Sequence, residues 1–302
     1  MPTRTSKSPK AVASVAYETA KQTLPAYHHK KSPKKFTQAQ LFTCLVLKEF
    51  FKTDYRGIEA ILMDTSDLRK VLELKHVPHY TTLQKAAHRL TGKGPLDRLM
   101  NDILEKATGM KLMRKTIRLS AIDSTGFESH HVSSYFVRRK AKGGGSVQET
   151  TYSRFPKVGI IIDRDSYLVL AGIPSWGPSP DILHWRVALH ETLKRKKLRI
   201  ILADAGYDAE HAHQFARDEH GIESIIPNRI GRPTKHLPTG KYRRIMATRF
   251  NKELYGQRWN IETVNSVIKR RLGSFLRART YWSQMREMML RIFTYNVLVV
   301  RL

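Results

Sequence analysis

The sequence predicts an α/β fold in which a mixed β-sheet is flanked by helices and preceded by a small all-helical region. Apolar residues recur at helical spacing between about residues 36 and 110. Strand-like apolar runs then alternate with helical segments up to about residue 226, and helices dominate again from about residue 251. Three strands in a meander, followed by alternating helices and strands, are typical of one mixed sheet with helices packed on it.

The individual elements follow from the same patterns. The predicted strands are Thr116–Ile122, Lys157–Asp163, Tyr167–Ile173, Leu198–Leu202 and Ile222–Ile226. The second and third should form a hairpin that turns at residues 164–166. The predicted helices between the strands are Asp181–Lys194 and Ala209–Glu219. Asp208 is interpreted as a helix cap, and Asp181 either as another cap or as a side chain that reaches a functional site.

The charge balance indicates a polyanionic partner. The 302 residues include 54 Lys and Arg against 26 Asp and Glu, which gives a net charge of +28 and a pI near 10.3. Proteins this basic most often bind nucleic acid, although a solvated basic surface is the alternative. The single cysteine, Cys44, excludes an intrachain disulfide and favours the cytoplasm. Without a signal-like run or an apolar stretch of roughly 18 residues, no membrane span is expected.

The chain divides into three segments by composition. Residues 1–35 are rich in Lys, Ser and Pro, and we expect a basic mobile arm with at most a short helix near Val12–Gln22. Residues 36–110 should form a small helical domain, in which Thr81 and Gln84 match the capping-box pattern. Residues 115–302 contain all the predicted strands and should form the sheet domain.

The most specific motif is Tyr255-x2-Arg258-x3-Glu262-x6-Lys269. On one helix, at about 100° per residue, these four positions fall on a single narrow stripe. The aliphatic residues of the same segment lie on the other side, where they can pack on the sheet; they are Val264, Val267, Ile268 and Leu272. A solvated helical face is the ordinary interpretation of such a stripe.

Two aspartates elsewhere in the sequence can bind metal ions together with Glu262 of this motif. Asp123 and Asp204 each follow a strand-like run, in AID and LAD. Two Mg²⁺ ions accelerate phosphodiester cleavage, and hard cations prefer carboxylate oxygens. If the two strands are neighbours and Glu262 approaches from the helix across them, the three acids can hold such ions. Either aspartate alone could equally be a turn or cap residue.

The stretches AIDSTGF, LADAGYDAE and YGQRWNIETVNSVIKRRLGS resemble prokaryotic insertion-sequence transposases of the DDE type, in the branch with the Y-x2-R-x3-E-x6-K motif. The resemblance implies a ribonuclease-H-like catalytic domain over residues 115–302 and a helical DNA-binding domain over residues 36–110. It further implies Mg²⁺-dependent cleavage of transposon ends and joining to target DNA. Mn²⁺ is expected to substitute for Mg²⁺, and a homodimer should hold the two transposon ends.

Carried over by position, the resemblance makes Asp123, Asp204 and Glu262 the catalytic, metal-binding acids. It makes Tyr255, Arg258 and Lys269 contacts to the terminal DNA. Arg270 and Arg271 extend this basic segment and are expected to contact phosphates. The expected location is the cytoplasm of a prokaryotic cell, at the nucleoid. The alternatives are a ribonuclease-H-like nuclease without strand transfer and a non-catalytic basic DNA-binding protein.

Other features of the sequence allow two interpretations each. The segment VPHYTTLQKAAHRL is either the recognition helix of a helix-turn-helix or an ordinary bundle helix. Trp259 and Trp282 are expected in the core, with stacking on an extruded base as the alternative. The paired histidines at 130–131 and at 211 and 213 lack a nearby third ligand, so a structural metal site is disfavoured.

Overall fold

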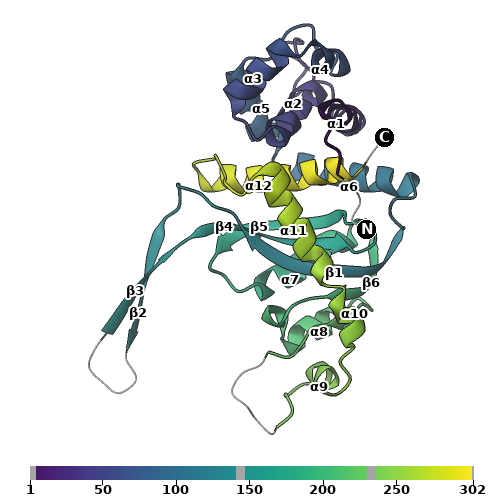
Figure 1. Ribbon diagram of the computed structural model, residues 1–302, viewed down its shortest axis with the longest axis vertical. Helices are drawn as coiled ribbons and strands as arrows, with labels where there is room; N and C mark the ends of the chain where they lie inside the picture. Colours follow the sequence, from purple (N-terminus) through teal and green to yellow (C-terminus); the bar gives the residue numbers. More distant parts are fainter. Residues whose placement is uncertain (1–4, 141–146, 230–235, 301–302) are drawn as a thin grey trace.

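The computed structural model describes residues 5–140, 147–229 and 236–300. It has a helical region stacked on a five-stranded sheet that is covered by helices on both faces (Figure 1). The predicted fold class, a mixed sheet flanked by helices after a helical N-terminal region, is therefore confirmed.

The N-terminal region consists of six helices. They are α1 (Pro9–Thr23), α2 (Gln38–Phe50), α3 (Tyr55–Asp64), α4 (Ser66–Val71), α5 (Tyr80–Leu90) and α6 (Lys93–Gly109). α2 begins with a capping box, in which Thr37 and Gln40 each satisfy the other's backbone N–H. The capping box expected at Thr81 is wrong, because α5 begins one residue earlier and is capped by the side chain of His79.

The expected mobile arm is wrong for residues 9–23. α1 is longer than the short helix that was predicted, and it packs against α2, α4 and α6. Its buried side chains recur at helical spacing, among them Val12, Ala16 and Ala20, all fully shielded. Because Lys and Glu residues stand between these apolar positions, the overall composition of the segment is polar and hides the stripe. Ser8 caps the helix, and Pro9 occupies its first turn, where its missing N–H has no cost.

The main sheet has the strand order β5-β4-β1-β6-β7. The strands are β1 (Thr116–Gly126), β4 (Phe155–Asp163), β5 (Val169–Gly177), β6 (Lys197–Leu202) and β7 (Glu223–Ile225). β1 is antiparallel to β4 and parallel to β6. The predicted hairpin is confirmed by the antiparallel pairing of β4 with β5. A second hairpin, β2 (Ser134–Lys140) and β3 (Val147–Ser153), was not predicted and extends away from the main sheet (Figure 1).

The register assigns each helix to one face of the sheet. Asp123 pairs with Ile160, which pairs with Gly172, so these three lie on one face. This face is covered by α11 (Trp259–Leu272) and α12 (Tyr281–Val299). Ser124 and Gly159 lie on the opposite face, where a Cβ on Gly159 would meet the ring of His184, in α7 (Ile182–Leu193), at 2.7 Å.

The remaining elements follow β6 and the loop after β7. They are the 3₁₀ turn η1 (Ala205–Tyr207), α8 (Glu210–Arg217), α9 (Lys241–Thr248) and α10 (Lys252–Gly256). Asp208 is not the cap of α8 that was expected, since Ala209 holds that position. Instead, the Asp208 carboxylate accepts two bonds from the Arg243 guanidinium, at 2.8 and 2.7 Å. This ion pair fixes the start of α9 beside the sheet.

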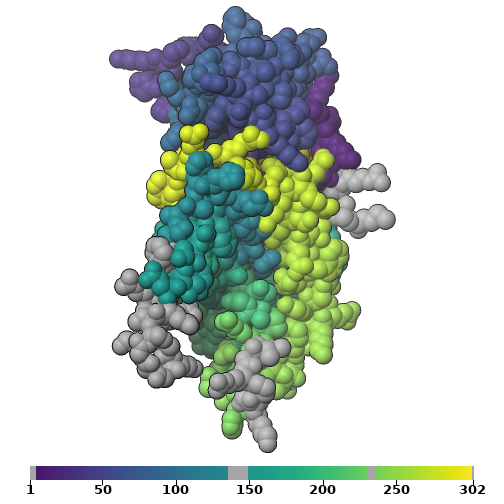
Figure 2. All heavy atoms as spheres, turned by 60° about the vertical axis from the view of Figure 1, so that its left-hand side comes forward, coloured from purple at the N-terminus to yellow at the C-terminus, as the bar shows by residue number. Residues whose placement is uncertain are grey.

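α12 joins the helical region to the sheet. It contacts α1, α2 and α6 on one side and β4 and β5 on the other, and nearly all of its residues are buried. Figure 2 shows the N-terminal helices seated directly on the atoms of α12. Arg291 of α12 is 3% exposed and donates to Glu49 of α2 at 3.0 Å and to Glu287. The two regions predicted as separate domains therefore share a buried charged contact.

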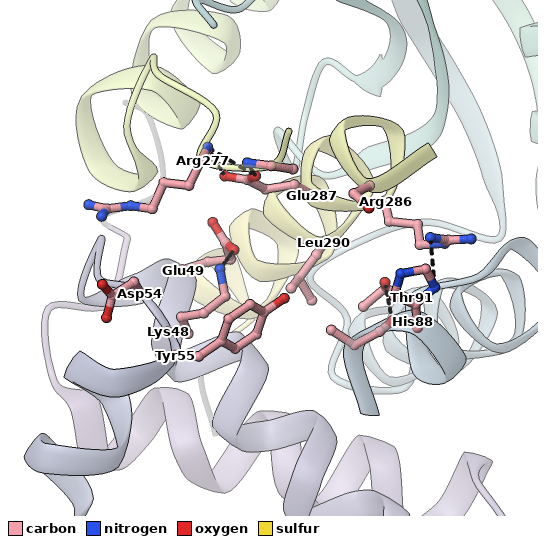
Figure 3. Close-up of a pocket in the computed structure, with 13 residues that line it drawn as sticks. Lys48, Glu49, Asp54, Tyr55, His88, Thr91, Arg277, Arg286, Glu287 and Leu290 are labelled. Atoms are coloured by element: carbon pink, nitrogen blue, oxygen red, sulfur yellow. Dashed lines mark hydrogen bonds and ion pairs between the residues drawn. The ribbon is translucent and has the colours of Figure 1, made fainter. Parts of the chain in front are cut away.

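Beside this contact lies a cavity of about 210 Å³. Figure 3 shows that the charged side chains facing it come from both regions: Lys48, Glu49 and Asp54 from the N-terminal helices, and Arg277, Arg286 and Glu287 from the C-terminal segment. Both signs of charge are present, and most of these side chains already have partners. Lys48 pairs with Glu49, and Glu287 accepts the backbone N–H groups of Arg277 and Ala278.

Candidate active site

The two predicted strand aspartates lie side by side. β1 and β6 are parallel neighbours, and the last register pair is Ala121 with Leu202. Two residues further along each chain come Asp123 and Asp204, so both occupy the same level at the carboxyl end of β6. β1 does not end at Asp123 as predicted, because it continues to Gly126 and keeps pairing with β4. Asp123 is thus held on the rigid centre of the sheet, whereas Asp204 stands at the exit of an adjacent strand.

Asp204 is fixed by the turn that follows β6. Its carboxylate accepts the backbone N–H of Gly206 at 2.9 Å and caps the 3₁₀ turn η1. A Cβ on Gly206 would lie 3.0 Å from the same carboxylate oxygen, so a larger residue would crowd this bond. The turn ends at Tyr207, which is fully buried and packs against Trp185 with the rings tilted by 49° and their centres 5.7 Å apart.

Asp123 sits in a desolvated position. Burial raises the pKa of the Asp123 carboxyl from 3.8 to about 6, while the backbone N–H of Ser124 and the charge of Arg258 oppose the increase. The neighbouring charges of Asp204 and Asp181 raise it further. Two carboxylates at close range in a partly buried site disfavour each other's ionisation, and a cation placed between them would relieve that repulsion.

A third aspartate lies beneath this pair. Asp181 occupies the N-cap position of α7, as predicted, but its side chain makes no capping hydrogen bond, and its charge acts on Asp123 instead. Its carboxylate accepts from the hydroxyl of Ser124 and forms an ion pair with Lys157, which also donates to the carbonyl of Ser179 at 2.8 Å. Ser124 points to the face of α7, opposite to Asp123. Asp181 therefore supports the site from the far face of the sheet, with its charge compensated by Lys157.

The four-residue motif is not carried by one continuous helix. Tyr255 lies in α10, which ends at Gly256; a turn follows at Gln257 and Arg258, and Arg258 is the N-cap residue of α11. The predicted single stripe is therefore broken between its first and second members. Arg258 and Glu262 keep the spacing of one helical turn and form an ion pair. Glycine at position 256 and the backbone bond from the Arg258 N–H to the Tyr255 carbonyl, at 2.9 Å, form the break.

The three predicted acids do not converge on one point. The Glu262 side chain is 57% exposed and is paired with Arg258 rather than directed at the aspartates. Within residues 5–140, 147–229 and 236–300, no three His, Cys, Asp or Glu side chains are grouped closely enough to hold an ion. The charge of Arg258 interacts both with the two aspartates and with Glu262. Although burial would lower the pKa of its guanidinium, the charges of Tyr255, Asp123 and Glu262 raise it.

The apolar back face of α11 holds the helix on the sheet. Val264, Ile268 and Leu272 are at most 1% exposed, as the periodicity predicted, while Val267 is only partly buried. α11 crosses β1 (Figure 1). At the crossing, the Nδ2 group of Asn265 donates to the Asp123 carboxylate at 3.3 Å. The residue of α11 that contacts Asp123 is therefore Asn265, which the sequence did not single out.

The basic residues after Glu262 make different contacts. Lys269 lies on the same side of α11 two turns further on, with its amine 6.0 Å from the centre of the Phe127 ring. Arg270 is exposed, and its carbonyl accepts from Lys52 of the helical region at 2.7 Å. Arg271 donates to the Ser6 carbonyl at 3.1 Å and so fastens the N-terminal segment. Within the described part of the chain, neither the Lys269 amine nor the Arg270 guanidinium forms a hydrogen bond or ion pair, whereas Arg271 would lose its bond to Ser6 on binding an external phosphate.

The remaining predicted features fall outside this site. Trp259 and Trp282 are 54% and 67% exposed, so the prediction that they belong to the core is wrong. Trp259 stands about 200° around α11 from the buried Ile261, which turns it to solvent. Of the histidines considered as ligands, His213 is fully buried and shares a hydrogen bond with Ser224 at 2.8 Å. On α5, Gln84, Lys85 and His88 are exposed, as either interpretation of that helix requires.

The profile of the transposase DDE domain matches residues 114–297, which is more than half of the chain. The protein belongs to the DDE transposase family. The match covers the whole five-stranded sheet, the two adjacent aspartates and the motif from Tyr255 to Lys269. The predicted class, a transposase that cleaves and transfers DNA, is confirmed. No curated protein gives a sequence match to this transposase.

Solved transposase structures are similar to this one only in part. A piggyBac transposase synaptic complex with hairpin DNA matches with a TM-score of 0.46 at 10% identity, over 96% of this chain and 72% of that one. A Mos1 mariner paired-end complex with Mn gives 0.23 at 11% identity, over 83% and 78%. A pre-cleavage Mos1 transpososome gives 0.24 at 14%, over 89% and 80%. The family assignment rests on the domain match alone.

Transposases of the DDE type use divalent metal ions, and the donors of this site fit such an ion. Asp123 and Asp204 offer adjacent carboxylates, the donors that hard cations prefer. Beside them, the Oδ1 atom of the buried Asn265 has no hydrogen-bond partner. DNA is the partner on which such an enzyme acts. Among the described residues, no helix combines the length and apolarity needed to cross a membrane.

Proposed function

We propose that this transposase holds two Mg²⁺ ions with Asp123, Asp204 and Glu262, cleaves DNA at the ends of its element and joins the freed 3′-hydroxyl to target DNA. The register of β1 and β6 is the observation that supports this most directly, because it makes Asp123 and Asp204 neighbours. Mn²⁺ should substitute for Mg²⁺, since both accept carboxylate and water ligands.

The ions, when bound, activate the attacking oxygen and stabilise the leaving oxygen of the phosphodiester. The chain positions the groups around them. β1 holds Asp123 within the sheet, and the Gly206 N–H orients Asp204. Glu262 joins them by leaving its ion pair with Arg258. The Glu262 side chain is exposed and has several rotatable bonds, so it is free to change rotamer once it leaves Arg258.

Arg258, once released, is available for the DNA backbone. A guanidinium binds phosphate through charge-assisted, bidentate hydrogen bonds. We propose that Tyr255, Arg258, Lys269 and Arg270 together follow the terminal DNA along α10 and α11, with Arg271 at the margin because it already binds the Ser6 carbonyl. The net charge of +28 supplies the long-range attraction that such a path needs.

Two transposon ends must be brought together before joining, so we propose a homodimer as the active assembly. The alternatives considered from the sequence make different predictions. A ribonuclease-H-like nuclease would cut but not join, and a non-catalytic protein would only bind. We place the protein at the nucleoid of a prokaryotic cell, where a basic DNA-joining enzyme meets its substrate.

One assay distinguishes these functions. The full chain is incubated with labelled duplexes that carry the ends of its element, a target plasmid and Mg²⁺. Joined products support transposition, nicked ends alone support the nuclease, and metal-independent binding without cleavage supports the third function. Asp123→Asn should abolish cleavage and joining. Asp165→Asn, in the exposed β4–β5 turn, is the matched control and should retain both. Full activity of Asp123→Asn would remove the proposed metal site.

A further inference from the structure

Asn265 is, with Asn260, one of two polar residues on the buried face of α11. Its neighbours on that face, Val264, Ile268 and Leu272, are aliphatic and at most 1% exposed. Asn265 itself is 8% exposed, one helical turn after Glu262. Burial of an amide among aliphatic side chains is unfavourable unless its hydrogen-bonding groups are satisfied. An asparagine at this position therefore lowers stability, and packing alone does not explain its presence.

The Asn265 amide is only half satisfied. Nδ2 donates to the Asp123 carboxylate at 3.3 Å, while Oδ1 is buried without a partner among the described residues. Asn260, on the same helix and 2% exposed, shows the opposite situation. Its Oδ1 accepts from the Tyr167 hydroxyl at 2.6 Å, and its Nδ2 donates to the Gln257 carbonyl at 2.6 Å. In Asn260 both the oxygen and the nitrogen of the amide are thus hydrogen-bonded within the protein, whereas in Asn265 the Oδ1 atom remains available beside Asp123.

A second unpaired group lies across the same carboxylates. The hydroxyl of Tyr207 is buried and has no hydrogen-bond partner in the part of the chain that the structure describes, and its surroundings include the charges of Asp181, Asp123 and Asp204. Unsatisfied buried groups are rare in native proteins and often belong to functional sites where an ion or ordered water is added. Their occurrence on both η1 and α11 indicates that the surroundings of Asp123 are arranged for such an addition.

We propose that Asn265 is a positioning residue of the metal site, which rests on the function proposed above. Its Nδ2 group orients the Asp123 carboxylate, and its free Oδ1 accepts a hydrogen bond from a water bound to the ion that Asp123 holds. Amide oxygens suit this role because Mg²⁺ and Mn²⁺ keep several of their waters, which need acceptors. Groups that orient a ligand carboxylate typically change metal affinity by about 10- to 100-fold when removed.

The proposal predicts opposite effects at the two asparagines. Asn265→Leu replaces a half-satisfied amide with an apolar group of similar size, so the metal-free protein should melt at the same or a higher temperature. Its dissociation constant for Mn²⁺ should nevertheless rise by about 10-fold. Asn260→Leu breaks two satisfied bonds and should lower the melting temperature while leaving Mn²⁺ affinity unchanged. Asn265→Ala serves as the second variant if leucine is not accommodated.

The test titrates the full chain with Mn²⁺ alone and measures free Mn²⁺ by electron paramagnetic resonance, beside melting curves in chelator. Weaker Mn²⁺ binding by Asn265→Leu with unchanged melting supports the proposal. Unchanged Mn²⁺ affinity in both Asn265 variants overturns it. Asp123→Asn distinguishes failure of this proposal from failure of the proposed function. If this variant also binds Mn²⁺ like the parent, the proposed function fails as well. If Asp123→Asn loses Mn²⁺ and the Asn265 variants do not, only the role of Asn265 is refuted.

Discussion

Replacement of Asp123 by Asn should stabilise the metal-free protein at neutral pH while it removes activity. Burial raises the pKa of Asp123 from 3.8 to about 6 in the folded protein. A carboxyl that ionises less readily in the folded state than in the unfolded chain lowers the free energy of unfolding as pH rises, between the two pKa values and fully above both. Asparagine has nearly the same shape and never ionises, so the variant avoids this cost.

The magnitude follows from the size of the pKa difference. At about pH 7.5 the ionised Asp123 costs about 3 kcal/mol, and at about pH 4.5 about 1 kcal/mol remains. Asp123→Asn should recover most of these amounts. In a chain of this length, 1 kcal/mol corresponds to roughly 2–4 °C in melting temperature. The gain should therefore be several degrees at pH 7.5 and clearly smaller at pH 4.5.

Urea unfolding in chelator at both pH values measures the effect. Asp165→Asn provides the control, because this exposed turn residue should change stability little at either pH. A loss of stability in Asp123→Asn at pH 7.5, or an equal gain at both pH values, would contradict the assignment of Asp123 as a desolvated carboxylate. Saturating Mg²⁺ should reverse the order and stabilise the parent protein over the variant, since only the parent binds the ion.

Three further outcomes are expected. Lys269→Ala should weaken DNA binding and reduce the slope of log K against log salt by about one unit, measured by fluorescence anisotropy; an unchanged slope removes Lys269 from the phosphate contacts. Glu49→Gln should lower the free energy of unfolding by about 3–5 kcal/mol, because it removes the charged carboxylate that the buried Lys48 and Arg291 share, whereas Asp67→Asn at an exposed pair should cost at most about 1 kcal/mol. Mn²⁺ should raise the melting temperature of the parent but not of Asp204→Asn, and an equal rise in both would exclude Asp204 as a ligand.

The sheet and its aspartates were accessible from the sequence because they depend on local patterns. The apolar runs before Asp123 and Asp204 are long enough to predict buried strands, and the parallel register that pairs Ala121 with Leu202 makes the residues two positions further on neighbours. The strand pairing itself is a property of the whole fold. The break after Tyr255 also escaped prediction, because the turn residues Gln257 and Arg258 are equally compatible with a helix and tertiary contacts decide between the two.

The supporting residues were hidden for a different reason. Asn265 and Lys157 act through contacts with residues 142 and 24 positions away in the chain, and no local spacing indicates either partner. The buried network around Glu49 and Arg291 links α2 to α12 across 242 positions. Such long-range contacts also explain why α1 was mistaken for a mobile arm, since its apolar stripe has meaning only beside α2 and α6.

The position of Arg258 couples the two steps that the site must perform. Its guanidinium lies within the electrostatic reach of Asp123, Asp204 and Glu262, and it is the partner that keeps Glu262 away from the aspartates. A metal ion that takes over these carboxylates removes the charges that stabilise Arg258 in place. A DNA phosphate is negatively charged, like the carboxylates that Arg258 loses, and offers Arg258 a new partner. Metal and DNA therefore each favour the same displacement of Arg258, and by thermodynamic linkage each should increase the affinity for the other.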